Sequence, residues 1–126
     1  MITGLHHICM KTQNDEEYAQ VRAFYTELLG LRIVTESEVC ALFDTGAGIV
    51  EIFRNGTEPM PLGVLRHFAF AVDDVDALIE TVRAAGCKIH VEPKDVQIGG
   101  NPKFPARVGF CIGPLGEQIE FFCQKW

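Results

Sequence analysis

The sequence predicts an α+β fold that is built from two copies of one βαβββ module. Three observations lead to this prediction. The chain has 126 residues, which is enough for one globular domain, whereas each half alone would be only marginally stable. The order of strand-like and helix-like segments in the first half recurs in the second half. A histidine in the first strand and a glutamate in the last strand also occupy matching places in both halves.

The composition is that of an ordinary globular protein. Apolar residues make up 48% of the chain and charged residues 22%, so intrinsic disorder is not expected. The sequence has no run of about 18 apolar residues, which is the length that a membrane-spanning helix needs. The first residues also lack the pattern of a secretory signal. The net charge of −6 argues against nucleic acid or an anionic membrane as the main partner, because both require a basic patch. We therefore expect a cytoplasmic protein.

The five cysteines are odd in number and never form a CxxC pair. Most of them lie in apolar runs, as Cys111 does. Buried, reduced thiols are therefore expected.

The first module begins with an apolar strand over residues 7–11. A helix over residues 15–29 follows, because its apolar residues recur with the spacing of a helical face. Asn14 or Asp15 can cap this helix and Gly30 ends it. Three further strands are expected, at residues 31–34, 39–43 and 49–53.

The second module repeats this order with a strand at residues 67–71 and a helix that Asp73 or Asp74 caps and Gly86 ends. Its other strands are expected at residues 87–91, 107–112 and 118–122. The segment between the modules is rich in turn formers and too short for a free tether. We place module one at residues 1–57, the joint at 58–64 and module two at 65–126, all within one domain.

Four polar residues interrupt the apolar pattern at matching places in the two halves. A carboxylate in an apolar strand costs several kcal/mol if it is buried and unpaired, and neither Glu51 nor Glu120 has a basic neighbour on its own strand. Two imidazoles and two carboxylates would balance a divalent cation and leave positions open for substrate. A lone strand histidine or glutamate is more often structural, so the prediction rests on the set of His7, Glu51, His67 and Glu120. His6 and His90 have no counterparts, and we interpret them as surface groups or as groups that support the ligands.

These residues resemble the vicinal oxygen chelate superfamily and, within it, glyoxalase I. The resemblance covers essentially the whole chain. Besides His7 and its neighbour Ile8, it is carried by FYTELLGL at residues 24–31, VEI at 50–52, RHFAFAVD at 66–73 and GEQIEF at 116–121. The order His, Glu, His, Glu matches the metal tetrad of bacterial glyoxalase I.

The resemblance implies the fold of the glyoxalase, bleomycin-resistance and dihydroxybiphenyl dioxygenase proteins, with one divalent ion per site, usually nickel or zinc. The implied substrate is the hemithioacetal of methylglyoxal and glutathione. The metal would act as a Lewis acid that stabilises an enediolate, and proton transfer would give S-lactoylglutathione. By position, Glu120 corresponds to the general base and Glu51 to its partner across the metal. Methylglyoxal detoxification by a homodimeric lyase is the implied role.

Lys11 and Asn55 are the implied substrate-binding residues. Lys11 stands where the family commonly carries an arginine that pairs with a glutathione carboxylate; lysine keeps the charge but loses the bidentate fork. As alternatives, Lys11 is an exposed cation at a strand end and Asn55 a turn residue. The segment 94–106 resembles the mobile loop near the glutathione end, and residues 113–116 read GPLG where the family has Asp-Pro-x-Gly. Whether one site is built within one chain or across two remains open.

Other members of the superfamily provide the alternatives. Acyl-CoA epimerases typically carry glutamine at the place of Glu51, whereas thiol transferases that inactivate fosfomycin and ring-cleaving dioxygenases use two histidines and one glutamate. Glu51 therefore argues against all three. A lyase that acts on another thiol would keep the same tetrad. A non-catalytic drug-binding resistance protein would generally lack it, so the metal content separates sequestration from catalysis.

Overall fold

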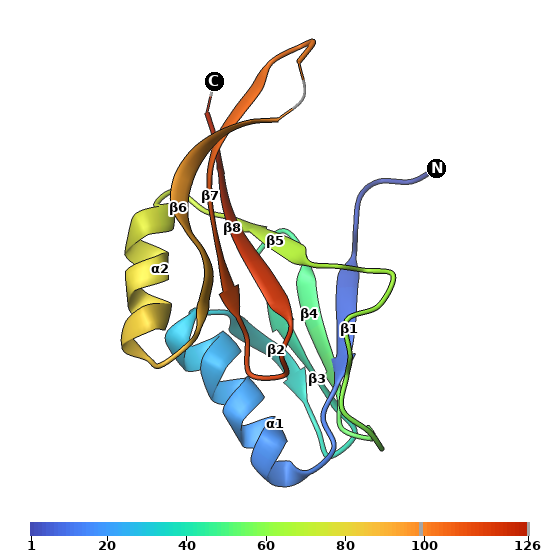
Figure 1. The fold of residues 1–126 in the computed structure, drawn as a ribbon. Helices are drawn as coiled ribbons and strands as arrows, with labels where there is room; N and C mark the ends of the chain where they lie inside the picture. The colour runs from blue at the N-terminus through green and yellow to red at the C-terminus, as the bar shows by residue number, and fades with distance from the viewer. Residues whose placement is uncertain (99, 126) are drawn as a thin grey trace. The chain divides into compact units, whose positions relative to one another are not determined.

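The computed structural model describes residues 1–98 and 100–125, and the order βαβββ occurs in it twice (Figure 1). The predicted fold class is therefore confirmed. The chain divides into two compact units, Met1–Pro61 and Leu62–Trp126, and each contains one four-stranded sheet. Among the described residues, no helix has the length and apolar character that crossing a membrane requires.

The first unit forms a sheet with the strand order β1-β4-β3-β2. Only β1 and β4 run parallel; the other neighbours are antiparallel. The strands are β1 (His7–Lys11), β2 (Arg32–Glu36), β3 (Cys40–Asp44) and β4 (Ile49–Phe53), and β1 and β4 have the predicted bounds. Asn14 caps the helix through a 2.8 Å hydrogen bond from the backbone N–H of Glu17.

The predicted first helix is divided into two parts, α1 (Asp15–Arg22) and a π-helical turn, η1 (Ala23–Leu28). The backbone N–H of Leu29 reaches the carbonyl of Phe24 at 3.0 Å, five residues back. Two consecutive aromatic residues, Phe24 and Tyr25, are both buried here, and the Tyr25 ring stacks on Phe43 of β3 at 6.3 Å between centroids. Both aromatic side chains of this wider turn therefore belong to the core of the unit.

Strand alternation decides on which face of the first sheet each side chain lies. In β4, Val50 and Ile52 are buried in the core, whereas Glu51 between them is only half-buried. Successive side chains of a strand point to opposite faces. The core on one face therefore directs Glu51 to the other face of the sheet.

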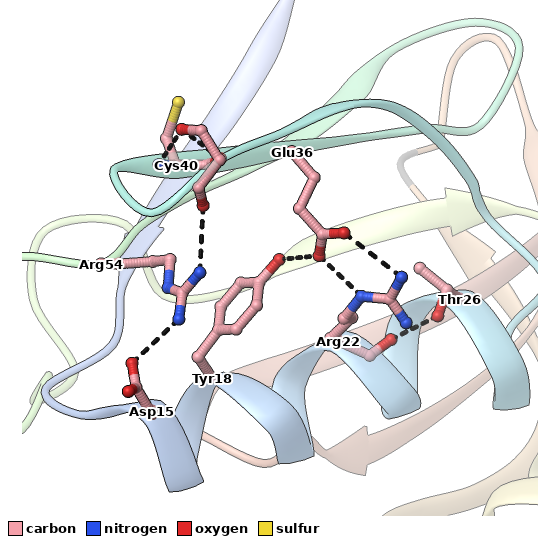
Figure 2. Close-up of polar contacts among 8 residues, drawn as sticks. Asp15, Tyr18, Arg22, Thr26, Glu36, Cys40 and Arg54 are labelled. Carbon is pink, nitrogen blue, oxygen red and sulfur yellow. Dashed lines mark hydrogen bonds and ion pairs between the residues drawn. The ribbon is translucent and has the colours of Figure 1, made fainter.

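Polar contacts hold α1 against β2, as Figure 2 shows. Glu36 accepts a hydrogen bond from the Tyr18 hydroxyl and forms an ion pair with Arg22 at 2.6 Å. The Arg54 guanidinium lies 3.9 Å above the Tyr18 ring and pairs with Asp15 at 2.9 Å. Burial and the hydrogen bond with Glu36 raise the pKa of Tyr18 to about 12, because both favour the protonated hydroxyl.

The second unit has the strand order β5-β8-β7-β6, again with one parallel pair, β5 and β8. Its helix, α2 (Val75–Ala84), is capped by Asp74, which accepts from the N–H of Ala77 at 2.9 Å. The helix packs closely on β7, because a Cβ atom at Gly109 would lie 2.9 Å from the Ile79 side chain. The strands are β5 (Phe68–Ala71), β6 (Ile89–Ile98), β7 (Phe104–Ile112) and β8 (Gln118–Gln124).

The expectation of a loop over residues 94–106 was wrong. β6 and β7 remain paired as far as Ile98 opposite Phe104, so most of this segment is a long β-hairpin (Figure 1). Apolar residues at alternate positions face each other across it, as Val96 faces Ala106, and such cross-strand pairs stabilise a ladder. Gly99, which belongs to the same segment, lies outside the described residues.

The expectation of buried thiols holds for one cysteine. Cys111 is buried, and burial raises the pKa of its thiol to about 12. Cys9 is exposed, and Cys40, Cys87 and Cys123 are half-buried; all five are free. Cys9 and Cys40 alternate with the buried residues Met10 and Ala41, so their side chains lie on the other face of the first sheet. Cys87 precedes β6, and Cys123 lies near the end of β8, where the burial of the strand decreases.

The turn between β7 and β8 explains the departure from Asp-Pro-x-Gly. The carboxylate of Glu117 accepts a hydrogen bond from the backbone N–H of Leu115 at 2.7 Å. A Cβ atom at Gly113 would overlap that carboxyl group. In an Asp-Pro-x-Gly turn, the aspartate at the first position accepts a hydrogen bond from the backbone N–H two residues later. Here the carboxylate of Glu117, which follows the turn, accepts that hydrogen bond instead.

A double-mutant cycle tests this exchange. Glu117→Ala should destabilise the protein by about 1–2 kcal/mol, because the N–H of Leu115 loses a charged acceptor. In a Gly113→Asp background the same change should cost less than about 0.5 kcal/mol, since the new carboxylate takes over the bond. Urea unfolding measures both. Equal costs in the two backgrounds would show that the carboxylates are not interchangeable.

Candidate metal centre

In the first unit, a histidine and a glutamate from neighbouring parallel strands face each other. His7 begins β1 and Glu51 is the middle residue of β4. The Nε2 atom of His7 lies 3.6 Å from a carboxylate oxygen of Glu51. The His7 side chain is 44% exposed and that of Glu51 20%, so the pair lies at a surface that a ligand can reach.

The second unit repeats this pair with a different surrounding. His67 immediately precedes β5, and its Nε2 atom lies 3.4 Å from a carboxylate oxygen of Glu120 in β8. The His67 ring stands edge-on to Phe110 of β7, with 5.1 Å between the ring centroids. The Glu120 side chain is only 13% exposed. This carboxylate is thus enclosed more tightly than its counterpart.

Both pairs fit the first coordination sphere of a divalent ion. Donor atoms that each lie about 2.1 Å from an ion are about 3.0–3.4 Å apart at bond angles of about 90–109°. The two nitrogen-to-oxygen distances of 3.6 and 3.4 Å therefore need only a small adjustment. Imidazole and carboxylate are ligands that zinc and nickel accept.

Each unit by itself supplies two such ligands. Within residues 1–98 and 100–125, no group of three or more His, Cys, Asp or Glu side chains is placed to hold a metal ion. A cation bound at one pair would thus keep positions for further ligands.

Burial makes Glu120 an unusual carboxylate. It raises the pKa of this group above its ordinary value, and the nearby His67 imidazole offsets only part of the effect. A carboxylate in such a place gains from either a proton or a cation. Groups with a pKa shifted in this way are typical of functional sites.

The candidate substrate-binding residues lie at one end of the first unit. Lys11 is the last residue of β1 and is exposed. Alternation puts its side chain on the same face as His7. Asn55 follows the end of β4 and is also exposed. The backbone N–H of Gly56 donates to the carbonyl of Thr12 at 2.9 Å. Because Gly56 follows Asn55 and Thr12 follows Lys11, this bond brings the backbones of the two candidate residues close together.

Sequence reasoning missed one neighbour of the first pair. Cys9 lies directly opposite Glu51 in the register of β1 and β4. Although its side chain is exposed, partial desolvation and the contact with Glu51 raise the pKa of its thiol. The corresponding position beside Glu120 is Ala69. Strand alternation, which puts residues 7, 9 and 11 on one face, was the signal that could have found it.

Comparison with known proteins identifies the family. The profile of the Glyoxalase/Bleomycin resistance protein/Dioxygenase superfamily matches residues 4–121. The chain belongs to this superfamily. Its members generally use a divalent metal ion and bind small molecules. The predicted resemblance is therefore confirmed at the level of the superfamily.

Similar individual proteins include two relatives by sequence and one solved structure. The chain is 32% identical over 117 residues to "Lactoylglutathione lyase GLX1" of Arabidopsis thaliana; the match covers 80% of this chain and 41% of that protein. It is 28% identical to the "Uncharacterized protein YaeR" of Escherichia coli, with 95% of both proteins covered. A glyoxalase I mutant from Zea mays superposes with a TM-score of 0.75 at 26% identity, covering 92% of this chain and 43% of that one. The chain spans about two-fifths of the length of the plant lyases that it matches.

Replacing Glu120 should stabilise the metal-free protein at neutral pH. Folding raises the pKa of Glu120, so the folded chain binds a proton more tightly than the unfolded chain. The resulting gain in stability is fully present below the unfolded pKa of about 4.5 and is lost as the pH rises through the folded pKa. Glu120→Gln removes the buried charge, so its melting temperature should exceed that of the unchanged protein by a few degrees at pH 7, with about 1 kcal/mol corresponding to roughly 3–6 °C.

The difference should shrink below about pH 4.5, where both side chains are uncharged. Glu16→Gln, at an exposed position in α1, is the matched control and should leave the melting temperature unchanged. Calorimetry of the metal-free proteins across this pH range makes the comparison. A lower melting temperature for Glu120→Gln at pH 7 would contradict the account of this carboxylate.

Proposed function

We propose that this protein is a metal-dependent lyase of the glyoxalase I kind. It converts the hemithioacetal of methylglyoxal and glutathione into S-lactoylglutathione. The duplicated contact between an imidazole nitrogen and a carboxylate oxygen, at 3.6 and 3.4 Å, carries the proposal. Similarity to plant lactoylglutathione lyases over 80% of the chain supports it. We further propose that the protein acts as a cytoplasmic homodimer.

His7, Glu51, His67 and Glu120 are the proposed ligands of one nickel or zinc ion. When bound, this ion supplies Lewis-acid stabilisation for the negative charge that develops on the substrate oxygens. Two carboxylates balance its charge, and the two imidazoles add no further charge. An ion of this kind also removes the conflict that two glutamates create on otherwise apolar strands.

Glu120 is the proposed general base. It takes the proton from the carbon that bears the sulfur, and a protonated glutamate returns a proton to the neighbouring carbon, so no oxidant or reductant is needed. In the metal-free chain burial raises the pKa of Glu120, and a bound cation would keep the group ionised until it takes the proton. Glu51 is the proposed partner in this transfer.

Lys11 and Asn55 are proposed to bind the thiol part of the substrate. Lys11 places a cation on the same face of β1 as His7, where it can pair with a carboxylate of the tripeptide. The exposed Asn55 offers an amide that both donates and accepts hydrogen bonds. Their exposure suits groups that must hold a substrate end outside the reacting centre.

Metal reconstitution and a base variant test the proposal. The purified protein should hold about one divalent ion per chain and form the lactoyl thioester, which absorbance detects. Glu120→Gln should keep the fold and lower the rate at least 100-fold, because general-base catalysis contributes about 10²–10⁴-fold. A Glu120→Gln variant with the normal rate would disprove the base assignment.

A comparison of thiols defines the substrate. Glutathione should be preferred to a thiol without carboxylates, and Lys11→Gln should reduce that preference mainly through KM, since the proposed role of Lys11 is to bind rather than to react. Lys88→Gln, at an exposed position of the second unit, is the control. An unchanged preference in Lys11→Gln would remove Lys11 from the binding site.

A further inference from the structure

The two adjacent histidines of the first unit contact each other through their rings. The Nδ1 atoms of His6 and His7 lie 3.0 Å apart, which is a hydrogen-bond distance. The rings are perpendicular, with 5.2 Å between their centroids. The other ring nitrogen of His7, Nε2, is the atom that lies 3.6 Å from Glu51. Both nitrogens of His7 thus have a defined neighbour.

This contact fits the tautomer of His7 that a metal ligand requires. Two nitrogens can share a hydrogen bond only if one of them carries the proton and the other offers a lone pair. A neutral imidazole carries one proton, so a proton on Nδ1 of His7 leaves its Nε2 as a lone pair. That lone pair is what a metal ion requires, and His6 then acts as the acceptor. Histidines that bind metals generally donate their other N–H to an acceptor, commonly a carboxylate, a backbone carbonyl or water, and the Nδ1 lone pair of His6 can take that place here.

We propose that His6 is a positioning residue that holds His7 as a metal ligand. It accepts the Nδ1–H of His7, fixes the orientation of the ring and leaves Nε2 free on the face with Glu51. The inference rests on the proposed metal centre and adds to it a residue outside the ligand set. Its hydrogen bond is exposed to solvent, so its contribution to stability is small and its effect lies in metal affinity.

In the second unit, the residue that precedes the histidine is an arginine instead of a histidine. Arg66 precedes His67, and a guanidinium has no acceptor for an imidazole N–H. His67 instead packs edge-on against Phe110 at 5.1 Å, which fixes its ring by contact. At the place of His6, the second unit thus has a residue that cannot accept this hydrogen bond, although both histidines face a glutamate.

Three variants separate positioning from structure. His6→Phe keeps a ring but removes the acceptor, whereas His6→Asn keeps an acceptor oxygen close to the place of Nδ1. Arg66→Ala, at the matching position of the second unit, is the control. Zinc titration of each metal-free protein gives the affinity. We expect His6→Phe to bind zinc about 10-fold more weakly, and His6→Asn and Arg66→Ala to bind it within about 2-fold of the unchanged protein.

Nitrogen-15 NMR of the zinc-loaded proteins gives a readout that does not depend on activity. The His7 Nδ1–H signal should be visible in the unchanged protein and in His6→Asn, and should be lost to solvent exchange in His6→Phe. Equal zinc affinities in all variants, or a His7 Nδ1–H signal that persists in His6→Phe, would overturn the role of His6. If the unchanged protein binds no zinc or nickel, the proposed metal centre fails first, and the role of His6 fails with it.

Discussion

The site depends on the contact between an imidazole and a carboxylate on two neighbouring parallel strands. In each unit, the first strand and the last strand are adjacent, as β1 and β4 are in the first sheet and β5 and β8 in the second. This order brings together two residues that lie 44 or 53 positions apart in the sequence. The core on one face of each sheet fills with apolar side chains, and the glutamate is directed to the opposite face. Desolvation raises the pKa of Glu120, and either a cation or a proton can offset this disadvantage of the charged form.

The two units carry the same pair with different neighbours. Beyond His7, the open face of β1 presents Cys9 and Lys11, whereas β5 presents Ala69 and Ala71 at the corresponding positions. The first unit therefore surrounds its pair with polar groups, and the second uses small and aromatic ones. Such a difference fits the proposed roles, in which the first unit binds a charged substrate end and the second encloses the proposed base.

Much of the fold was readable from the sequence because local signals agreed with one another. Capping residues, closing glycines and alternating apolar residues bounded most helices and strands, and β4 has the bounds expected from its alternation. The long hairpin of β6 and β7 was missed because the segment 94–106, with its glycines, prolines and lysines, resembles the mobile loop of the family. The pairing of Val96 with Ala106 depends on a partner strand, which local sequence does not report. The π-helical turn was missed because apolar spacing does not report which carbonyl an N–H reaches.

The candidate site was readable only as a set. No single member of the tetrad differs from an ordinary strand residue, and the repeat alone drew attention to all four. The contact between His6 and His7 could not be foreseen, since successive side chains of an extended chain point to opposite faces. It arises because His6 precedes β1 and is free of the alternation of that strand.

We propose that the two repeated pairs bind one divalent ion together. The most direct test of this central claim is the free energy of unfolding as a function of free nickel or zinc concentration, for the unchanged protein and for His7→Ala and His67→Ala. A ligand that binds only the folded chain stabilises it by RT ln(1 + [L]/Kd). The account predicts that the unchanged protein gains about 2.7 kcal/mol at 100 times Kd and that either variant loses most of this gain. Stabilisation that survives in either variant would contradict the claim.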